Sequence, residues 1–96
     1  MKDTDYLINL IENSHATKKP ETDIECLRSA IIAEYDAVNM YENFASKCKN
    51  DLAKKVFLDI ANEEKQHIGE FEKLAEKIDP DFVKMRNKGR LEVEDM

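Results

Sequence analysis

Glycine and proline are nearly absent from this chain, and their scarcity is the feature that most restricts its fold. The 96 residues include two of each, and the stretch from Thr22 to Cys48 contains neither. Both residues commonly end helices and form the tight turns that sheets require. Alanine, glutamate, lysine, leucine and isoleucine, which favour long helices, are abundant instead. The sequence therefore predicts an all-α protein.

The ends of the main helices can be placed from residues that cap free backbone groups. Thr22 and Glu25 form a capping box at the start of a helix that we expect to extend to about Cys48. Asn50-Asp51 can cap a second helix that extends to about Ile78. Because the connection between them is so short, the two helices should form an antiparallel hairpin.

Shorter segments flank the hairpin. Pro80 disfavours helical geometry at the residue before it, so the second helix should stop there. A short third helix is expected over Asp81–Lys88, closed by Gly89, and followed by a mobile tail. A short amphipathic helix is expected near the N-terminus at Tyr6, Leu7, Leu10 and Ile11. The predicted parts are an N-terminal segment and linker (1–22), the hairpin (23–79), and a C-terminal helix with a flexible tail (80–96).

Three polar residues occupy positions that should belong to the core. Positions spaced alternately three and four residues apart form a stripe along one side of the first helix. Every residue of this stripe is apolar or amphipathic except Glu34. On the second helix, Glu64 and His67 fall in the corresponding stripe. A hairpin that turns between Lys49 and Asn50 pairs positions whose numbers sum to about 99. Glu34 should therefore lie level with Glu64 and His67.

Two carboxylates and an imidazole at one depth of an apolar seam indicate a metal site. A bare carboxylate is costly to remove from water, and a divalent cation supplies the compensating charge. Oxygen and nitrogen donors of this kind suit iron, manganese or zinc. Two alternatives are a hydrated or protonated polar cluster, and a glutamate that pairs with a lysine at the hairpin edge.

One chain supplies only half of a ferritin-like ligand set. Such di-metal sites take a glutamate from each of two helices and a Glu-x-x-His pair from each of two others. Glu34 together with Glu64 and His67 provides one of each. The hairpin also has an apolar face that it cannot bury alone. We therefore predict a symmetric homodimer that completes a four-helix bundle, with metals near the two-fold axis.

Composition argues against several other classes of protein. Fifteen basic and 21 acidic residues give a net charge of −6, so the basic surface of a nucleic-acid-binding protein is missing. No apolar run is long enough to span a membrane, and the N-terminal one is too short for a signal peptide. Cys26 and Cys48 form no CxxC pair, so rubredoxin-type and zinc-ribbon sites are not expected. We expect a cytoplasmic protein with reduced thiols.

Two segments, Ala30–Glu42 and Ile60–Phe71, resemble the ferritin-like superfamily. The first carries a glutamate followed seven residues later by Tyr41, and the second carries the Glu-x-x-His pair. The similarity extends over about Glu25–Phe82 and is strongest to the encapsulated ferritins. Members of that family are half-length, two-helix chains carried inside encapsulin shells.

This resemblance implies a set of site residues, cofactors and partners. It implies that Glu34, Glu64 and His67 are iron ligands, with two irons at each dimer interface and manganese or zinc as substitutes. Tyr41 matches a tyrosine that lies beside the ligands in many ferritins. The resemblance also implies a ferroxidase whose dimers assemble into a ring inside an encapsulin nanocompartment.

The sequence departs from this family at several positions. Met40 stands where some relatives have tryptophan, and Ala33 stands where some carry an acidic residue of a surface cluster that admits metal. Asp36 keeps an acidic group nearby. The peptide that targets relatives to the shell is matched only weakly by the apolar residues of the tail, which are Leu91, Val93 and Met96.

The sequence supports three functional hypotheses. The leading one is a ferroxidase that oxidises Fe2+ to Fe3+ with O2 or peroxide between two subunits and feeds iron storage inside a shell. The second is a rubrerythrin-like peroxide reductase, which would need an external electron donor because CxxC pairs are missing. The third is a non-catalytic helical oligomer whose metal locks the interface.

Overall fold

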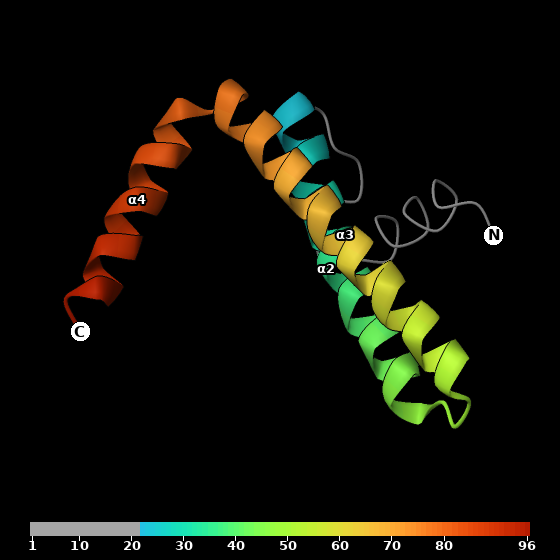
Figure 1. Cartoon of the computed structure of the whole chain (residues 1–96). Coiled ribbons are helices and arrows are strands. Elements are labelled where there is room, and N and C mark those ends of the chain that lie inside the picture. The colour runs from blue at the N-terminus through green and yellow to red at the C-terminus, as the bar shows by residue number, and fades with distance from the viewer. Residues whose placement is uncertain (1–21) are drawn as a thin grey trace.

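The computed structural model describes residues 22–96, which form three helices and no strand (Figure 1). The helices are α2 (Asp23–Lys47), α3 (Asp51–Ile78) and α4 (Pro80–Glu94). Helices α2 and α3 lie side by side as an antiparallel hairpin, and α4 bends away from it after α3 (Figure 1). The all-α prediction is confirmed. The predicted N-terminal helix falls on residues 1–21, outside the described part of the chain.

Side-chain caps begin each of the three helices. The Thr22 hydroxyl accepts a hydrogen bond from the backbone N–H of Glu25 at 3.2 Å and donates one to its carboxylate at 3.0 Å. Asn50 accepts from the N–H of Ala53 at 2.9 Å, and Asp79 accepts from the N–H of Phe82 at 3.3 Å. These caps satisfy N–H groups that have no partner within their own helix. The predicted boundaries of the hairpin helices are therefore correct to within a residue.

The predicted end of the third helix at Gly89 is wrong, because α4 continues to Glu94. Glycine ends a helix most readily in a left-handed conformation, and no glycine among residues 22–96 has a positive φ. The residues after Gly89 include arginine, leucine and glutamate, which propagate a helix well. Most of the expected mobile tail is thus helical, and Leu91 and Val93 belong to α4.

Small side chains line the contact between α2 and α3. Five alanines of the hairpin are at most 7% exposed: Ala33, Ala37, Ala45, Ala61 and Ala75. Larger apolar residues of the predicted stripe, including Val56, Leu74 and Ile78, remain nearly half exposed. Val56 and Leu74 lie about 100–140° around α3 from the buried Ala61 and Ala75, and so they project away from the contact with α2. The hairpin thus has a thin core and an uncovered apolar face.

None of the helices within residues 22–96 combines the length and the apolar character needed to cross a membrane.

Candidate metal centre

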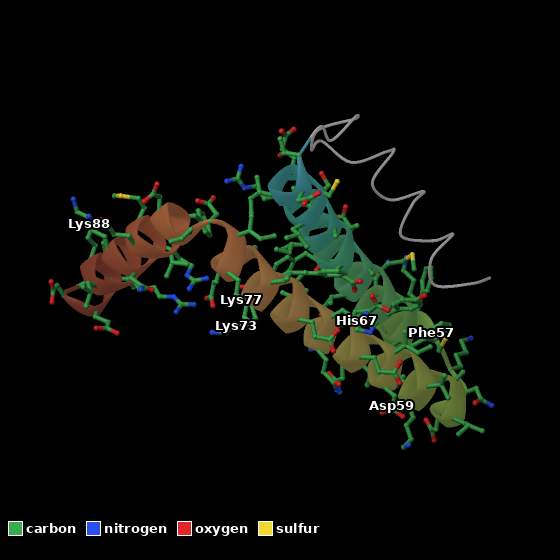
Figure 2. The ribbon with its side chains drawn as sticks, turned by 90° about the horizontal axis from the view of Figure 1, so that it is seen from above. Phe57, Asp59, His67, Lys73, Lys77 and Lys88 are labelled. Carbon is green, nitrogen blue, oxygen red and sulfur yellow. The ribbon has the colours of Figure 1, made fainter. Side chains whose placement is uncertain are left out.

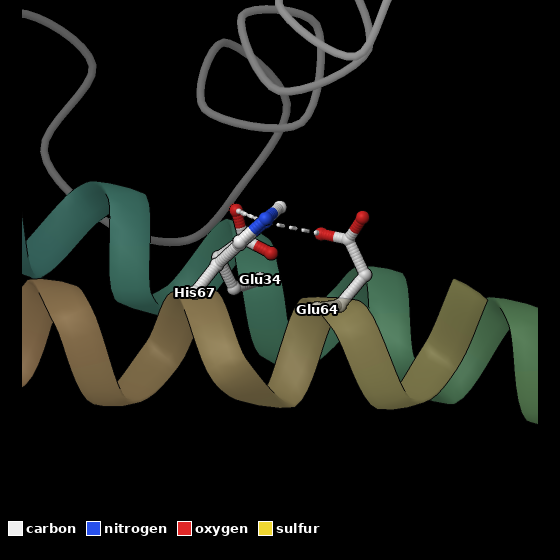
Figure 3. Close-up of side chains that lie close together, drawn as sticks. All are labelled: Glu34, Glu64 and His67. Carbon is white, nitrogen blue, oxygen red and sulfur yellow. Dashed lines mark ion pairs between the residues drawn. The ribbon is translucent and has the colours of Figure 1, made fainter. Parts of the chain in front are cut away.

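The three polar residues singled out from the sequence meet inside the hairpin. Glu34 comes from the middle of α2, and Glu64 and His67 come from successive turns of α3 (Figure 3). One donor atom of each residue lies within 4.8 Å of the other two. Glu34 is completely buried and Glu64 is 5% exposed, while the His67 side chain is 36% exposed. The cluster is therefore closed toward the hairpin and open beside His67.

The imidazole of His67 lies between the two carboxylates. Its Nδ1 atom is 3.4 Å from Oε1 of Glu34 and 3.6 Å from Oε2 of Glu64 (Figure 3). The hairpin register explains the meeting, since a turn at residues 48–50 places the middle of α2 opposite the middle of α3. Both residues of the Glu-x-x-His pair face the same way because three residues span almost one helical turn.

The cluster concentrates negative charge where water has limited access. Two carboxylates within 4.8 Å of each other repel by at least about 3.5 kcal/mol at an effective dielectric constant near 20. A divalent cation bound between them would replace this repulsion with attraction. Two carboxylates and one imidazole match the donor preferences of iron, manganese and zinc, so this donor set fits such a metal. Three donors also leave coordination positions available for a further ligand or a reactant.

The open side of the cluster borders an exposed apolar stripe on α3. Val56, Leu74 and Ile78 lie seven or eleven residues from His67, which places all four on one side of the helix. The three apolar side chains are 46–48% exposed. A second hairpin packed on this stripe would cover both the apolar residues and the opening beside His67.

Tyr41 lies in an aromatic cluster next to the polar one. Its ring stacks on Phe57 with centroids 6.2 Å apart, and Phe44 packs edge-on against both rings at 6.4 and 5.5 Å. Tyr41 is two helical turns from Glu34 toward the hairpin loop, a distance of about 10.5 Å along the axis. The predicted hydrogen bond from its hydroxyl to a metal ligand is a proposal.

An ion pair at the hairpin edge was not foreseen from the sequence. Lys65 contacts Glu42 at 3.0 Å across the two helices. The lysine at this edge therefore pairs with a surface glutamate instead of the buried ones.

Asp36 does not extend the acidic cluster. It is exposed, and its position two residues after Glu34 places it about 200° around α2. It therefore points to the opposite side of the helix and provides no acidic approach to the three donors.

Comparison with known proteins places this arrangement in a family. Residues 25–95 match the rubrerythrin family. The crystal structure of an encapsulated ferritin domain from Pyrococcus furiosus is similar with a TM-score of 0.77 and 40% identity, over 88% of this chain and 86% of that one. A ferritin-like-encapsulin shell fusion protein from Pyrococcus furiosus is 44% identical over 73 residues. That match covers 76% of this chain but only 21% of the fusion protein.

The site and the comparisons lead to the same assignment. The matched region spans α2, α3 and α4, and includes the Glu-x-x-His pair and the glutamate opposite it. The resemblance to the encapsulated ferritins is confirmed by both the sequence and the structural match. The chain belongs to the rubrerythrin family of ferritin-like proteins.

Proposed function

We propose that this protein is a ferroxidase that oxidises Fe2+ to Fe3+ at a di-iron site shared by two subunits. Its membership in the rubrerythrin family and its similarity to an encapsulated ferritin domain support an iron-related function. The observation that carries the proposal is the meeting of Glu34, Glu64 and His67 within 4.8 Å in a mostly buried cluster.

Each donor has a definite part in this chemistry. The carboxylates of Glu34 and Glu64 are hard, negatively charged donors that favour Fe3+ over Fe2+, and so they promote loss of an electron. The imidazole of His67 completes the set from one chain and holds the half-exposed position through which Fe2+, the substrate, arrives. Positions that these side chains leave open on each iron would give O2 access. Two Fe2+ ions would transfer two electrons to one O2, which takes up two protons and leaves as hydrogen peroxide.

A second chain is needed to complete the site. A ferritin-like di-iron centre requires two copies of each element that one chain supplies once. Two-fold packing on the exposed stripe around His67 would bring in the second set and bury apolar surface at the same time. We therefore propose two irons per dimer interface, with manganese or zinc able to take their place.

Tyr41 is proposed as a positioning residue. Its ring is held by Phe44 and Phe57, so its hydroxyl can orient a ligating carboxylate or histidine of its own chain or of the second one. The ligand that it holds would then have a fixed geometry toward iron.

Storage of the oxidised iron is assigned to an enclosing shell. One hairpin cannot surround a mineral, and a similar protein is named as a fusion of a ferritin-like part with an encapsulin shell. We propose that dimers of this chain form a larger ring-like assembly in the cytoplasm, inside an encapsulin nanocompartment.

Oxidation kinetics test the proposal directly. Protein loaded with Fe2+ without oxygen is mixed with O2, and the absorbance of Fe3+ is followed. Glu34→Ala should slow the reaction at least about tenfold, because it removes a donor from the iron. Glu63→Ala is the matched control, since Glu63 is an exposed neighbour of Glu64. Equal rates in the wild type and Glu34→Ala would overturn the proposal.

The match to rubrerythrin favours peroxide reduction as a second candidate function. Replacement of O2 by hydrogen peroxide, together with a chemical electron donor, separates the two. Continued consumption of peroxide, together with the electron donor, identifies a reductase. A single oxidation of the bound Fe2+, after which the electron donor is not consumed, identifies a ferroxidase. Metal binding with no oxidation above the buffer rate identifies an oligomer in which metal only locks the interface.

Sedimentation tests the shared site independently of catalysis. Metal that binds across the interface favours association by mass action. Addition of Fe2+ without oxygen should shift the wild type to a larger species, and Glu34→Ala should abolish the shift. An assembly that is unchanged by Fe2+ and by the substitution would argue against ligands from two chains.

A further inference from the structure

The three donors of the candidate metal centre come from both long helices of a single chain. Glu34 belongs to α2, whereas Glu64 and His67 belong to α3. An ion held by all three side chains would therefore join α2 to α3 within one subunit. Such a link acts on the hairpin itself, whether or not the ion reacts and whether or not a second subunit is present.

The spacing of the donor atoms fits one shared ion better than it fits hydrogen bonds. Nδ1 of His67 is 3.4 Å from Oε1 of Glu34 and 3.6 Å from Oε2 of Glu64. An N–H···O hydrogen bond measures about 2.7–3.2 Å between its heavy atoms. Two donors that bind one ion at about 2.1 Å, with a tetrahedral angle between them, lie about 3.4 Å apart. Because no two of the three donors are more than 4.8 Å apart, small rotations of the glutamate side chains are enough to place all three on one ion.

The contact between α2 and α3 has a small apolar core. Seven apolar residues of the described chain are at most 7% exposed, and five of them are alanines. The largest of the fully buried side chains among residues 22–96 is that of Glu34, which is charged. Domains with so small a core commonly rely on disulfides, a structural metal or a further subunit.

Neither a disulfide nor α4 reinforces the hairpin beside the cluster. Cys26 and Cys48, the two cysteines of the chain, are both free thiols. Helix α4 projects from the end of α3, and Lys88 on α4 lies well away from His67 (Figure 2). Within the described part of the chain, the reinforcement available at this level of the hairpin is therefore a metal link through Glu34.

The charges of the cluster also suit one ion per chain. Glu34 is completely buried and Glu64 is 5% exposed, so both carboxylates lie where the effective dielectric constant is well below that of water. Together they carry two negative charges, which one divalent ion balances. One ion per chain also gives two ions per dimer, which is the number proposed for the shared site.

We propose that one divalent metal ion, bound by Glu34, Glu64 and His67 of a single chain, cross-links α2 to α3 and stabilises the hairpin before a second subunit arrives. This inference rests on the metal site of the proposed function, but not on iron oxidation. The unfolded chain has no preformed site of this kind, so the free energy of binding adds to that of folding. Each subunit then enters the dimer with its own ion in place, and the second subunit adds its donors to a site that already holds metal.

A variant that cannot pair at the metal centre isolates this step. Val56→Lys together with Leu74→Lys makes two copies repel each other at the exposed apolar stripe of α3, where both original side chains are nearly half exposed. Both positions are at least about 10.5 Å along the axis from His67, so their charge is largely screened at the cluster in physiological salt. Leu58→Lys is the matched control, because Leu58 is 43% exposed and lies about 180° around α3 from His67.

Electron paramagnetic resonance of Mn2+ counts the bound ions and shows whether two of them are magnetically coupled. The double variant should bind one Mn2+ per chain as an uncoupled ion, with a dissociation constant that does not depend on chain concentration. Mn2+ at a hundred times this constant should raise the melting temperature, followed by circular dichroism, by at least about 10 °C. The single variant Leu74→Lys, which changes the stripe less, should show the same rise, and Leu58→Lys should show coupled pairs of Mn2+ as the wild type does.

Removal of the donor on α2 should abolish the link. In the double-variant background, Glu34→Gln leaves Glu64 and His67 as neighbours on one helix, so an ion bound there joins nothing to α2. Mn2+ should bind at least about tenfold more weakly, because loss of even a residue that only orients a ligand costs about that much. The rise in melting temperature should be lost as well, whereas Glu63→Gln in the same background should keep both the binding and the rise.

The cross-link and the ferroxidase can fail separately. If Mn2+ stabilises the double variant while the wild type oxidises no iron, the cross-link stands without the ferroxidase. If the wild type oxidises iron but the double variant neither binds Mn2+ nor gains thermal stability, the ion binds only between two chains and the cross-link is overturned. Coupled Mn2+ pairs in the double variant with no uncoupled ion, or a full rise in melting temperature after Glu34→Gln, would overturn it too.

Discussion

Replacement of Glu34 by glutamine should change stability in opposite directions with and without metal. Glu34 is buried and lies in the same cluster as Glu64, within 4.8 Å. The repulsion between the two carboxylates is at least about 3.5 kcal/mol at an effective dielectric constant near 20. Removal of this repulsion stabilises the variant. The weaker contact of an amide with the His67 imidazole and the imperfect hydrogen bonding of a buried amide offset part of that stabilisation. We therefore expect Glu34→Gln to raise the free energy of unfolding in chelator by about 2 kcal/mol.

With metal bound, the wild type should be more stable than Glu34→Gln. A cation present at a hundred times its dissociation constant stabilises the wild type by about 2.7 kcal/mol, while the variant lacks one of the donors and gains much less. Urea unfolding followed by circular dichroism, in chelator and in Mn2+, measures both effects without iron oxidation. Glu63→Gln is the control and should change stability by less than about 0.5 kcal/mol under either condition.

The crossing of the two stability curves is what the reasoning requires. If Glu34→Gln is less stable than the wild type in chelator and gains as much stability from Mn2+, then the buried carboxylates neither repel strongly nor bind metal. A variant that is stabilised in chelator but keeps the full response to metal would remove Glu34 alone from the proposed ligand set.

Three further predictions follow from the site and its supports. Tyr41→Phe should slow iron oxidation while sedimentation and helical content stay unchanged, and a wild-type rate would exclude a role for its hydroxyl. The Arg86 guanidinium beside Glu76 holds the pKa of that carboxyl below its ordinary value of 4.5, so the stabilisation of α4 is present above that value and is lost as pH falls through the lowered pKa. Hydrogen exchange should show this as a loss of protection of the α4 amides at low pH. In Glu76→Gln the protection should already be low at neutral pH, so no further loss should appear as pH falls. Thr22→Ala should lower the free energy of unfolding by about 1 kcal/mol in urea titrations, and no change would mean that the cap at α2 is redundant.

The helix boundaries and the polar cluster were predictable because their signals are local or repeat with the helical period. Thr22 and Asn50 cap the backbone within three residues of themselves, so the chain sequence alone placed the starts of α2 and α3. Glu34, Glu64 and His67 interrupt a regular apolar stripe, and the short turn determined which of them stand level. The helical period and the length of the loop between α2 and α3 were sufficient to predict that these three residues meet.

The end of α4 was not predictable, because a glycine can end a helix or continue it. Gly89 has the local signature of a helix end, but its conformation depends on whether the following residues stay in register with the helix. They do, and α4 reaches Glu94 with Val93 on the same side as Phe82.

Only the tertiary structure decided which apolar residues are covered and which charges pair. The stripe on α3 is wider than the contact that α2 can bury, so Val56 and Leu74 remain nearly half exposed. Periodicity gives the direction of a side chain around its own helix, but not how far a neighbouring helix extends over it. For the same reason the pairs Lys65–Glu42 and Arg86–Glu76 required the packed structure, since exposed charges of either sign occur on every side of these helices.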